Sequence, residues 1–302
     1  MRGFLSLTVL LGVVQMSAMA MAADGGVARL ATETHMVSAL MTYNVTLVPA
    51  QGSPFVSGSG TLTERATHSC KGWASEQRLY VRFMPPQQGV APVQPVFLRS
   101  GSNSFESADG LTYAFEDKAN LGGQMVVSHK GVAQLTAAGQ AGKVTYADPA
   151  SQTLELPAGT VFPSAFSSGL LTAAGDGQRR FSAVVFDGSM DPDKALLNMQ
   201  AQIGTPRAAV FKSQGAQPVY QVTPDFNPAL AWSVKVSGMQ PASGAGQNAD
   251  GVQQPVVQQT FSLLTNGRAE TSVMDFGNFR LQLDLVKYEE FPDSGGCASA
   301  PQ

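Results

Sequence analysis

The sequence predicts an all-β protein with a mainly antiparallel sheet that is curled or closed. In many segments apolar and polar residues alternate with a period of two, which is typical of strands with one buried and one solvated face. These short segments are separated by Gly, Asn, Asp and Pro, the residues that favour turns. A long series of short strands joined by such turns is typical of a sheet that closes on itself.

The clearest strand lies near the C-terminus, where Phe279, Leu281, Leu283 and Leu285 alternate with polar residues. The same alternation occurs early in the chain at 41–47. Further strands are predicted at 79–83, 111–115, 125–128, 143–146, 181–186, 219–222, 232–236 and 260–264.

Three dipeptides predict tight hairpin turns. Asp109-Gly110 and Asn266-Gly267 are flanked by strand-like residues, and Asp187-Gly188 is a third candidate. Asn, Asp and Gly tolerate the positive φ that the central positions of a type I′ turn require. We therefore expect meander connections between neighbouring strands.

One helix is predicted, which begins at Pro163 and is stopped by Gly175. Proline is favoured in the first helical turn, and Phe166, Leu170 and Leu171 share one face. The segment 191–202 is ambiguous, because its residues favour a helix while its surroundings favour a strand. The polar stretches 85–95 and 240–255 are expected to be surface loops.

The N-terminus predicts a signal peptide over residues 1–22. It has Arg2, an apolar run at 4–14, and small residues that allow cleavage after Ala20 or Ala22. That run is shorter than the roughly 20 residues of a membrane-spanning helix. We therefore expect an exported, soluble and monomeric chain with a single β domain over residues 23–302.

The charge composition argues against a nucleic-acid partner. Charged residues make up 14% of the chain, the net charge is −3, and lysine and arginine are dispersed. Binding to phosphates needs a basic surface that neutralises them.

The two cysteines, Cys70 and Cys297, both fall in the exported part of the chain. Oxidation is the usual fate of two thiols in that environment, and if they pair within the chain the connectivity is unambiguous. The alternative is a reactive thiol, which His68, two residues from Cys70, would favour. We expect the disulfide.

No metal, cofactor or catalytic site is predicted. His35, His68 and His129 are widely spaced and lack zinc-ligand spacing. The series Asp187, Ser189, Asp191 and Asp193 resembles a calcium loop, but it is interrupted by a proline, lacks the sixth-position glycine and has no glutamate at the twelfth position.

Three further patterns are interpreted as chance or as structural. The stretch 244–249 matches a dinucleotide fingerprint but lies in a polar loop, without the required strand and helix. Glu289 and Glu290 are neighbours on a predicted strand, so they point to opposite faces and cannot act as an acid pair. Asn44-Val45-Thr46 fits a glycosylation site but lies within a strand.

Several segments, taken in their order along the chain, resemble the EipB-like family of periplasmic cell-envelope integrity proteins. Those that carry the resemblance are Tyr43-Asn44-Val45-Thr46-Leu47, Cys70-Lys71-Gly72-Trp73, Gln77-Arg78, Glu106-Ser107, Asp109-Gly110-Leu111-Thr112-Tyr113-Ala114-Phe115, Leu156-Pro157-Ala158-Gly159-Thr160-Val161-Phe162-Pro163, Phe186-Asp187-Gly188-Ser189, Asn266-Gly267, Asp275-Phe276-Gly277-Asn278-Phe279 and Cys297.

The resemblance implies an open, spirally curled β-barrel of about 14 strands with a short helix. It also implies a disulfide from Cys70 to Cys297, a periplasmic location and a non-enzymatic contribution to envelope integrity under stress. One departure is Phe166, at a position three residues after the Phe-Pro pair where the family often has histidine. Any role of a polar side chain there is in doubt for this chain.

The leading hypothesis is an envelope-integrity protein that binds a peptide, a lipid or a partner protein on the concave face of the curled sheet. An alternative is an exported hydrolase acting on cell-wall or lipid substrates through residues that meet only in the fold. A third possibility is a structural element without a ligand, whose interior is packed to normal density.

Overall fold

The computed structural model describes residues 34–87, 89, 92–150, 152–209, 230–241 and 255–293. Fifteen strands and one helix lie within these ranges. The elements are β1 Ala39–Pro49, β2 Ser57–Ser69, β3 Gly72–Met84, β4 Val96–Ser107, β5 Thr112–Leu121, β6 Gln124–Leu135, β7 Gly142–Asp148, β8 Thr153–Leu156, β9 Thr160–Val161, α1 Pro163–Gly175, β10 Arg180–Phe186, β11 Leu196–Ala208, β12 Leu230–Met239, β13 Val257–Leu264, β14 Ala269–Asp275 and β15 Phe279–Glu290.

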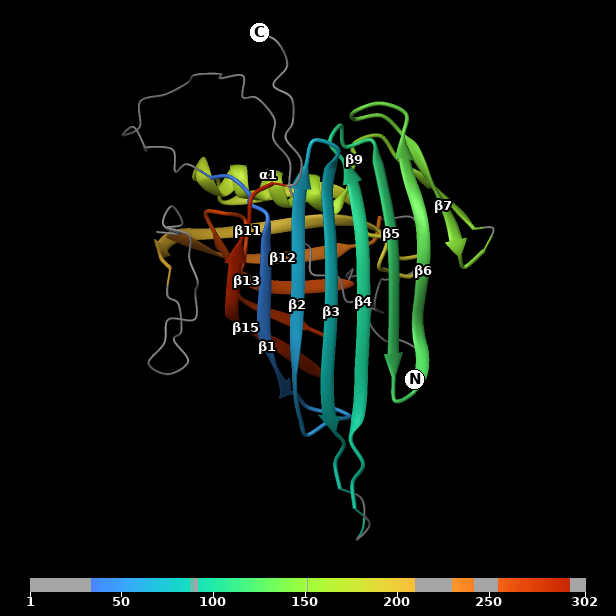
Figure 1. The fold of residues 1–302 in the computed structure, drawn as a ribbon, viewed down its shortest axis with the longest axis vertical. Coiled ribbons are helices and arrows are strands. Elements are labelled where there is room, and N and C mark those ends of the chain that lie inside the picture. Colours follow the sequence, from blue (N-terminus) through green and yellow to red (C-terminus); the bar gives the residue numbers. More distant parts are fainter. Residues whose placement is uncertain are drawn as a thin grey trace, which may run out of the picture.

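The strands form a single sheet in the order β8-β7-β6-β5-β4-β3-β2-β1-β15-β14-β13-β12-β11-β10-β9. Strands that are consecutive in sequence therefore lie side by side, except that β8 and β9 form the two edges of the sheet, and β1 pairs with β15. All pairings are antiparallel apart from the short β9–β10 pair. Figure 1 shows β1–β6 as upright strands at the front, with β11–β13 crossing behind them and α1 lying across the upper end. The expected curled antiparallel barrel with one short helix is confirmed.

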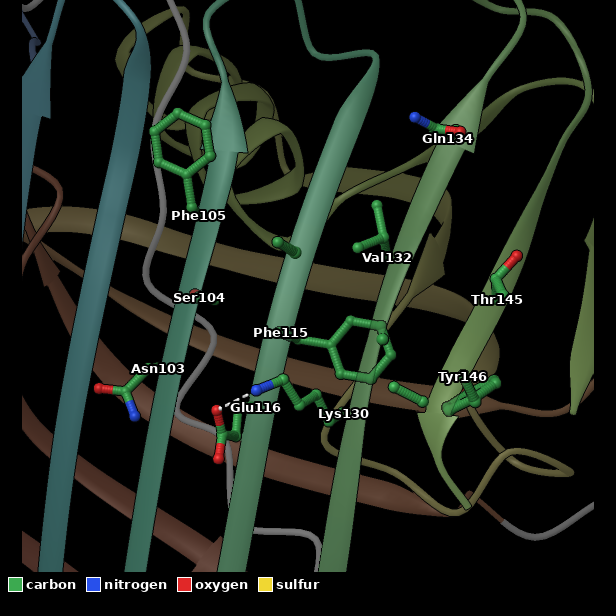
Figure 2. Close-up of a pocket in the computed structure, with 13 residues that line it drawn as sticks. Asn103, Ser104, Phe105, Phe115, Glu116, Lys130, Val132, Gln134, Thr145 and Tyr146 are labelled. Carbon is green, nitrogen blue, oxygen red and sulfur yellow. Dashed lines mark hydrogen bonds and ion pairs between the residues drawn. The ribbon is translucent and has the colours of Figure 1, made fainter. Parts of the chain in front are cut away.

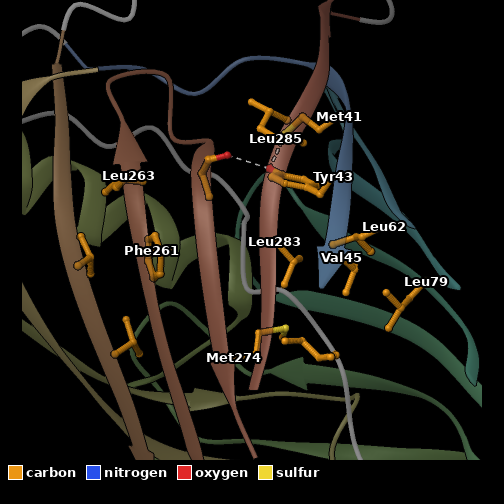
Figure 3. Close-up of a cluster of buried hydrophobic side chains, with 14 of the residues drawn as sticks. Met41, Tyr43, Val45, Leu62, Leu79, Phe261, Leu263, Met274, Leu283 and Leu285 are labelled. Carbon is orange, nitrogen blue, oxygen red and sulfur yellow. Dashed lines mark hydrogen bonds between the residues drawn. The ribbon is translucent and has the colours of Figure 1, made fainter. Parts of the chain in front are cut away.

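Alternation along the strands divides the sheet into a buried inner face and a more exposed outer face. The register aligns Tyr43 with Leu62 and Leu285, and Val45 with Leu283, so side chains from neighbouring strands form continuous rows. Figure 3 shows several of these buried side chains pointing into one space: Met41, Tyr43, Val45, Leu62, Leu79, Phe261, Leu263, Met274, Leu283 and Leu285. The Tyr43 hydroxyl donates to the carbonyl of Ala269, 3.0 Å away.

Helix α1 completes this main core. It buries Phe166, Leu170 and Leu171 among residues of the sheet, and the Phe166 and Phe181 rings lie 5.4 Å apart. Phe166 is thus a core residue in this chain. A second apolar cluster lies between β5–β8 and the ends of β10 and β11; it includes Tyr113, Phe115, Tyr146, Phe162, Phe186 and Met190.

The structure resolves the ambiguous segment 191–202 in favour of a strand from Leu196 onward. Leu197, Met199 and Ala201 alternate with less buried residues, so burial on the sheet outweighs the local preference for helix. The predicted helix is confirmed: it begins at Pro163, and Gly175, predicted to stop it, is its last residue before the C-cap Asp176. The predicted strand 219–222 lies outside the described residues, as do the predicted signal peptide and the fingerprint-like stretch 244–249.

The hairpin prediction is right for two dipeptides and wrong for the third. Gly110 and Gly267 have φ angles of 69° and 75° and lie in short connections between paired strands. Asp187-Gly188 instead begins a longer connection, over residues 187–195, between β10 and β11. Gly188 does not have a positive φ. A glycine is needed there because the Phe115 ring packs against its backbone and leaves no space for a Cβ atom.

Candidate functional site: a buried polar row and an outer trough

A row of polar side chains crosses the inner face of five neighbouring strands. The register pairs Glu64 with Gln77, Gln77 with Ser102, Ser102 with Asp117, and Asp117 with His129. All five residues are buried. The apolar residues Leu62, Leu79, Ala119 and Val127 lie on one side of this row, and the second apolar cluster lies on the other. We call it the polar row.

One end of the polar row holds an ion pair without solvent access. Glu64 on β2 and Arg268, just before β14, are both 0% exposed, and their closest charged atoms are 3.8 Å apart. Arg268 also donates from Nη2 to the carbonyl of Val37. Neither Glu64 oxygen has a hydrogen-bond partner among the described residues. Burial raises the pKa of Glu64 to about 7, and the attraction to Arg268 only partly offsets this effect.

Two buried carboxyl groups, those of Asp117 and Asp187, interact electrostatically at the other end of the polar row. Burial raises the pKa of Asp117 to about 7, although a hydrogen bond from Ser102 lowers it. The negative charge of Asp187 adds to the increase. Burial also raises the pKa of Asp187, although the hydroxyl and the amide of Ser189 donate to its Oδ1 at 2.7 and 3.0 Å. Burial also raises the pKa of Tyr113, and the negative charge of Asp187 raises it further by a smaller amount.

His129 closes this end of the row, but it does not activate a nucleophile. Its Nδ1 lies 3.2 Å from the carbonyl oxygen of Ser189, and its Nε2 lies 3.7 Å from a carboxylate oxygen of Asp191. The Ser189 hydroxyl points instead to Asp187. A serine nucleophile would need its hydroxyl in hydrogen-bond contact with the base, so these groups do not form a hydrolytic site.

A buried glutamate outside the row connects the sheet to α1. Glu106, on β4, accepts hydrogen bonds from the backbone amides of Ser164 at 2.8 Å and Ala165 at 3.1 Å. These amides are in the first turn of α1, whose N-cap residue Phe162 supplies no side-chain acceptor. Glu106 therefore caps the helix from a distant strand. Burial raises its pKa to about 7 even though these hydrogen bonds favour the carboxylate.

A shallow trough lies on the outer face of β4–β7 (Figure 2). It has a volume of about 700 Å³, and the Lys130–Glu116 ion pair, 3.1 Å long, lies within it. Figure 2 shows Phe105, Val132 and Thr145 along three of its strands. We call it the outer trough; its lining residues are Asn103, Ser104, Phe105, Ala114, Phe115, Glu116, Lys130, Gly131, Val132, Gln134, Thr145, Tyr146 and Ala147.

The structure places only one of the two predicted disulfide cysteines. Cys70 lies in the turn between β2 and β3, and Cys297 lies outside the described residues, so the bond stays a prediction. The chain after β15 returns to this turn, where Asp293 contacts His68 Nδ1 at 2.7 Å and the Ser38 hydroxyl at 2.7 Å. His68 also stacks on Trp73, with ring centroids 4.6 Å apart.

The other residues considered for metal sites do not converge. Among the described residues, no group of three or more His, Cys, Asp or Glu side chains is placed to hold a metal ion. In the calcium-like series, Asp187 accepts hydrogen bonds from Ser189, while Asp191 pairs with Lys194 at 2.9 Å. Glu290 accepts from the Tyr288 hydroxyl, whereas Glu289 lies near Lys287, as expected for opposite faces.

Sequence reasoning missed the polar row and the Glu106 cap. The relevant signal was a charged or amide side chain at an inward position of an alternating strand, such as Gln77 two residues before Leu79. Only the register shows that five such positions are adjacent.

Within the described ranges, α1 has 13 residues and no helix is long and apolar enough to cross a bilayer.

Comparison with known proteins gives a consistent result. The cell envelope integrity protein EipB of Brucella abortus (strain 2308) is 26% identical over 285 residues, which cover 90% of this chain and 92% of that protein. A crystal structure of a β-barrel-like protein from Brucella abortus, described as a domain of unknown function, superposes with a TM-score of 0.71 at 23% identity. The superposition covers 86% of this chain and 100% of the chain in that crystal structure, which supports the fold. The EipB-like family model matches residues 30–292, and the chain therefore belongs to the EipB-like family.

Proposed function

We propose that this protein supports cell-envelope integrity from the periplasm, without catalysis, by binding a peptide, a lipid or a partner protein. The observation that carries the proposal is the family match over residues 30–292, together with a curated relative named for envelope integrity that aligns along nearly its whole length. The predicted signal peptide supports export.

We place the binding surface on the outer trough and not on the concave face first considered. The inner face is filled by buried side chains, including Tyr43, Phe83 and Trp232, and by the apolar residues of α1. A guest there would have to displace a packed core, which is energetically costly. The outer trough instead offers the partly exposed Phe105 and Val132 on the paired strands β4–β6.

No observation favours the alternative of an exported hydrolase. Each of the buried acids Glu64, Glu106 and Asp117 has a structural partner: Arg268, the first turn of α1, and Ser102. A catalytic acid must also reach a substrate, and these three side chains are buried.

The Cys70–Cys297 disulfide forms part of the same proposal. Asp293 is hydrogen-bonded beside His68, two residues from Cys70, and Cys297 follows only four residues later. Four extended residues span up to about 14 Å, so the C-terminal cysteine is within reach of the turn. The bond would hold the segment that follows β15 against the β2–β3 turn.

The test has two arms. The first uses cells that lack the gene, and the second restores the protein with a photo-cross-linking residue in it. Loss of the gene is expected to sensitise cells to detergent and to cell-wall antibiotics. With the cross-linker at Val132 we expect one discrete adduct, whose mass identifies a protein, peptide or lipid. Val48 on β1 is the matched control, because its exposure of 40% is close to the 39% of Val132.

Unchanged resistance in the deletion strain would refute the envelope role. Equal cross-linking at Val132 and Val48 would refute the choice of the outer trough. The two arms therefore test the function and its location separately.

A further inference from the structure

The connection between β10 and β11, residues 187–195, packs directly over one end of the polar row. A Cβ placed on Gly188 would lie 2.4 Å from Phe115 Cγ, so the ring lies flat against the backbone of this connection. Met190 is buried in the second apolar cluster, and the carbonyl of Ser189 contacts His129. The connection therefore acts as a cover over Asp117 and the aromatic residues beside it.

This cover is closed over acidic groups from several elements. Asp187 from the connection itself and Asp117 from β5 are both buried. Glu106 on β4, Tyr113 on β5 and Tyr146 on β7 are the other titratable groups that face them, and His129 on β6 is the basic group. Asp191 and Lys194 pair with each other at the exposed rim of the connection. On the outer face, Glu116 lies next to Asp117 in sequence and pairs with Lys118 and Lys130.

We propose that Asp117 and Asp187 form a proton-controlled latch. When protons neutralise these carboxyl groups, the connection 187–195 stays closed on the second apolar cluster. When both groups are ionised, their repulsion and their need for water open the connection locally, while the sheet remains folded.

The direction of the effect follows from proton binding in the two states. An aspartate in water has a pKa near 3.8, whereas burial, and then the charge of Asp187, raise the pKa of Asp117 in the closed state to about 7. The closed state therefore binds protons more tightly than the open one. Closure is favoured fully below about pH 4 and weakens as the pH rises to about 7, with the opening constant increasing roughly tenfold per pH unit for each proton released.

Native-state hydrogen exchange measures this opening directly. The amides of Asp187, Met190 and Lys194 donate to carbonyls within the connection, and the amide of Ser189 donates to the Asp187 carboxylate. After correction for intrinsic exchange, we expect their protection to fall about tenfold per pH unit between pH 5 and 7 and to level off near pH 8. Amides of β12, in the main core, serve as the internal reference.

Asp117→Asn removes one titrating group and should flatten the pH dependence of protection in the connection. Asp187→Asn is the second variant, which covers the case in which Asp117→Asn does not fold. Asp193→Asn is the matched control, because Asp193 lies on the same connection but is exposed.

Protection that does not change between pH 5 and 8 in the unmodified protein would overturn the latch. So would an undiminished pH dependence in the folded Asp117→Asn or Asp187→Asn variant. Loss of protection in β12 in parallel with the connection would show global unfolding and would equally contradict a local latch.

Discussion

Glu106 is the residue whose substitution tests the electrostatics of this fold most sharply. Its carboxylate, buried on β4, is the acceptor for two amides of α1 and replaces a local N-cap. At about 1.4 kcal/mol per pH unit, the rise in its pKa from 4.5 to about 7 corresponds to about 3 kcal/mol.

The sign of this contribution is set by the folded state, which binds the Glu106 proton more tightly than the unfolded chain does. The stabilisation is complete below about pH 4.5 and is lost as the pH rises through about 7. Glu106→Gln keeps one acceptor oxygen but does not titrate. Compared with the unmodified protein, the Gln variant should therefore gain about 2–3 kcal/mol of relative stability between pH 5 and 8.

Glu106→Ala separates the cap from the titration. It leaves two amides of α1 without their acceptor, and each unsatisfied buried amide costs about 1–3 kcal/mol at any pH. The assay is urea unfolding at pH 5 and pH 8, followed by the fluorescence of the buried Trp73 and Trp232. A Gln-minus-Glu difference that is the same at both pH values would refute the reasoning, and so would an Ala variant as stable as the Gln variant.

Two further predictions concern packing and the covalent link. Gly188→Ala should destabilise the protein by about 1–3 kcal/mol through overlap with the ring of Phe115. Phe115→Leu in the same chain should recover part of this loss. If the two substitutions change the free energy of denaturant unfolding additively, the contact is contradicted. Cys70→Ser should lower the melting temperature by on the order of 10 °C, because a disulfide to Cys297 would close a loop of more than 200 residues, whereas identical melting with and without reductant in the unmodified protein would remove the proposed bond.

The sequence is sufficient to predict the architecture because the main-core strands repeat one simple pattern. Leu281, Leu283 and Leu285 alternate with polar residues, and the structure pairs them with β1 as a buried face. The start of helix α1 is predictable because proline is favoured in the first helical turn, where Pro163 lies. Its end is less so, because the glycine with a positive φ is Gly177 and not Gly175. The family resemblance predicts about 14 strands; the described part of the chain contains fifteen, among them the two-residue β9, which is too short to show a periodicity.

The candidate sites are much less predictable, because they depend on contacts between distant residues. Glu106 and Ser164 are 58 positions apart, and Arg268 and Glu64 meet only because β1 and β15 join the two halves of the sheet. Propensity also misleads at 191–202, where tertiary burial selects a strand. The dipeptide Asp187-Gly188 matches a hairpin-turn signal, but a glycine is needed there for packing against the Phe115 ring and not for a positive φ.

The most direct test of the central claim is complementation of a gene-deletion strain with two kinds of variant. Phe105→Asp and Val132→Asp change the outer trough, whereas Glu64→Gln and Asp117→Asn neutralise buried acids while keeping their shape. If the protein acts by contact, the first pair should lose detergent resistance at normal protein levels and the second pair should retain it. Loss of resistance with the neutralised acids and full resistance with the trough variants would contradict the account and indicate chemistry at the buried carboxyl groups.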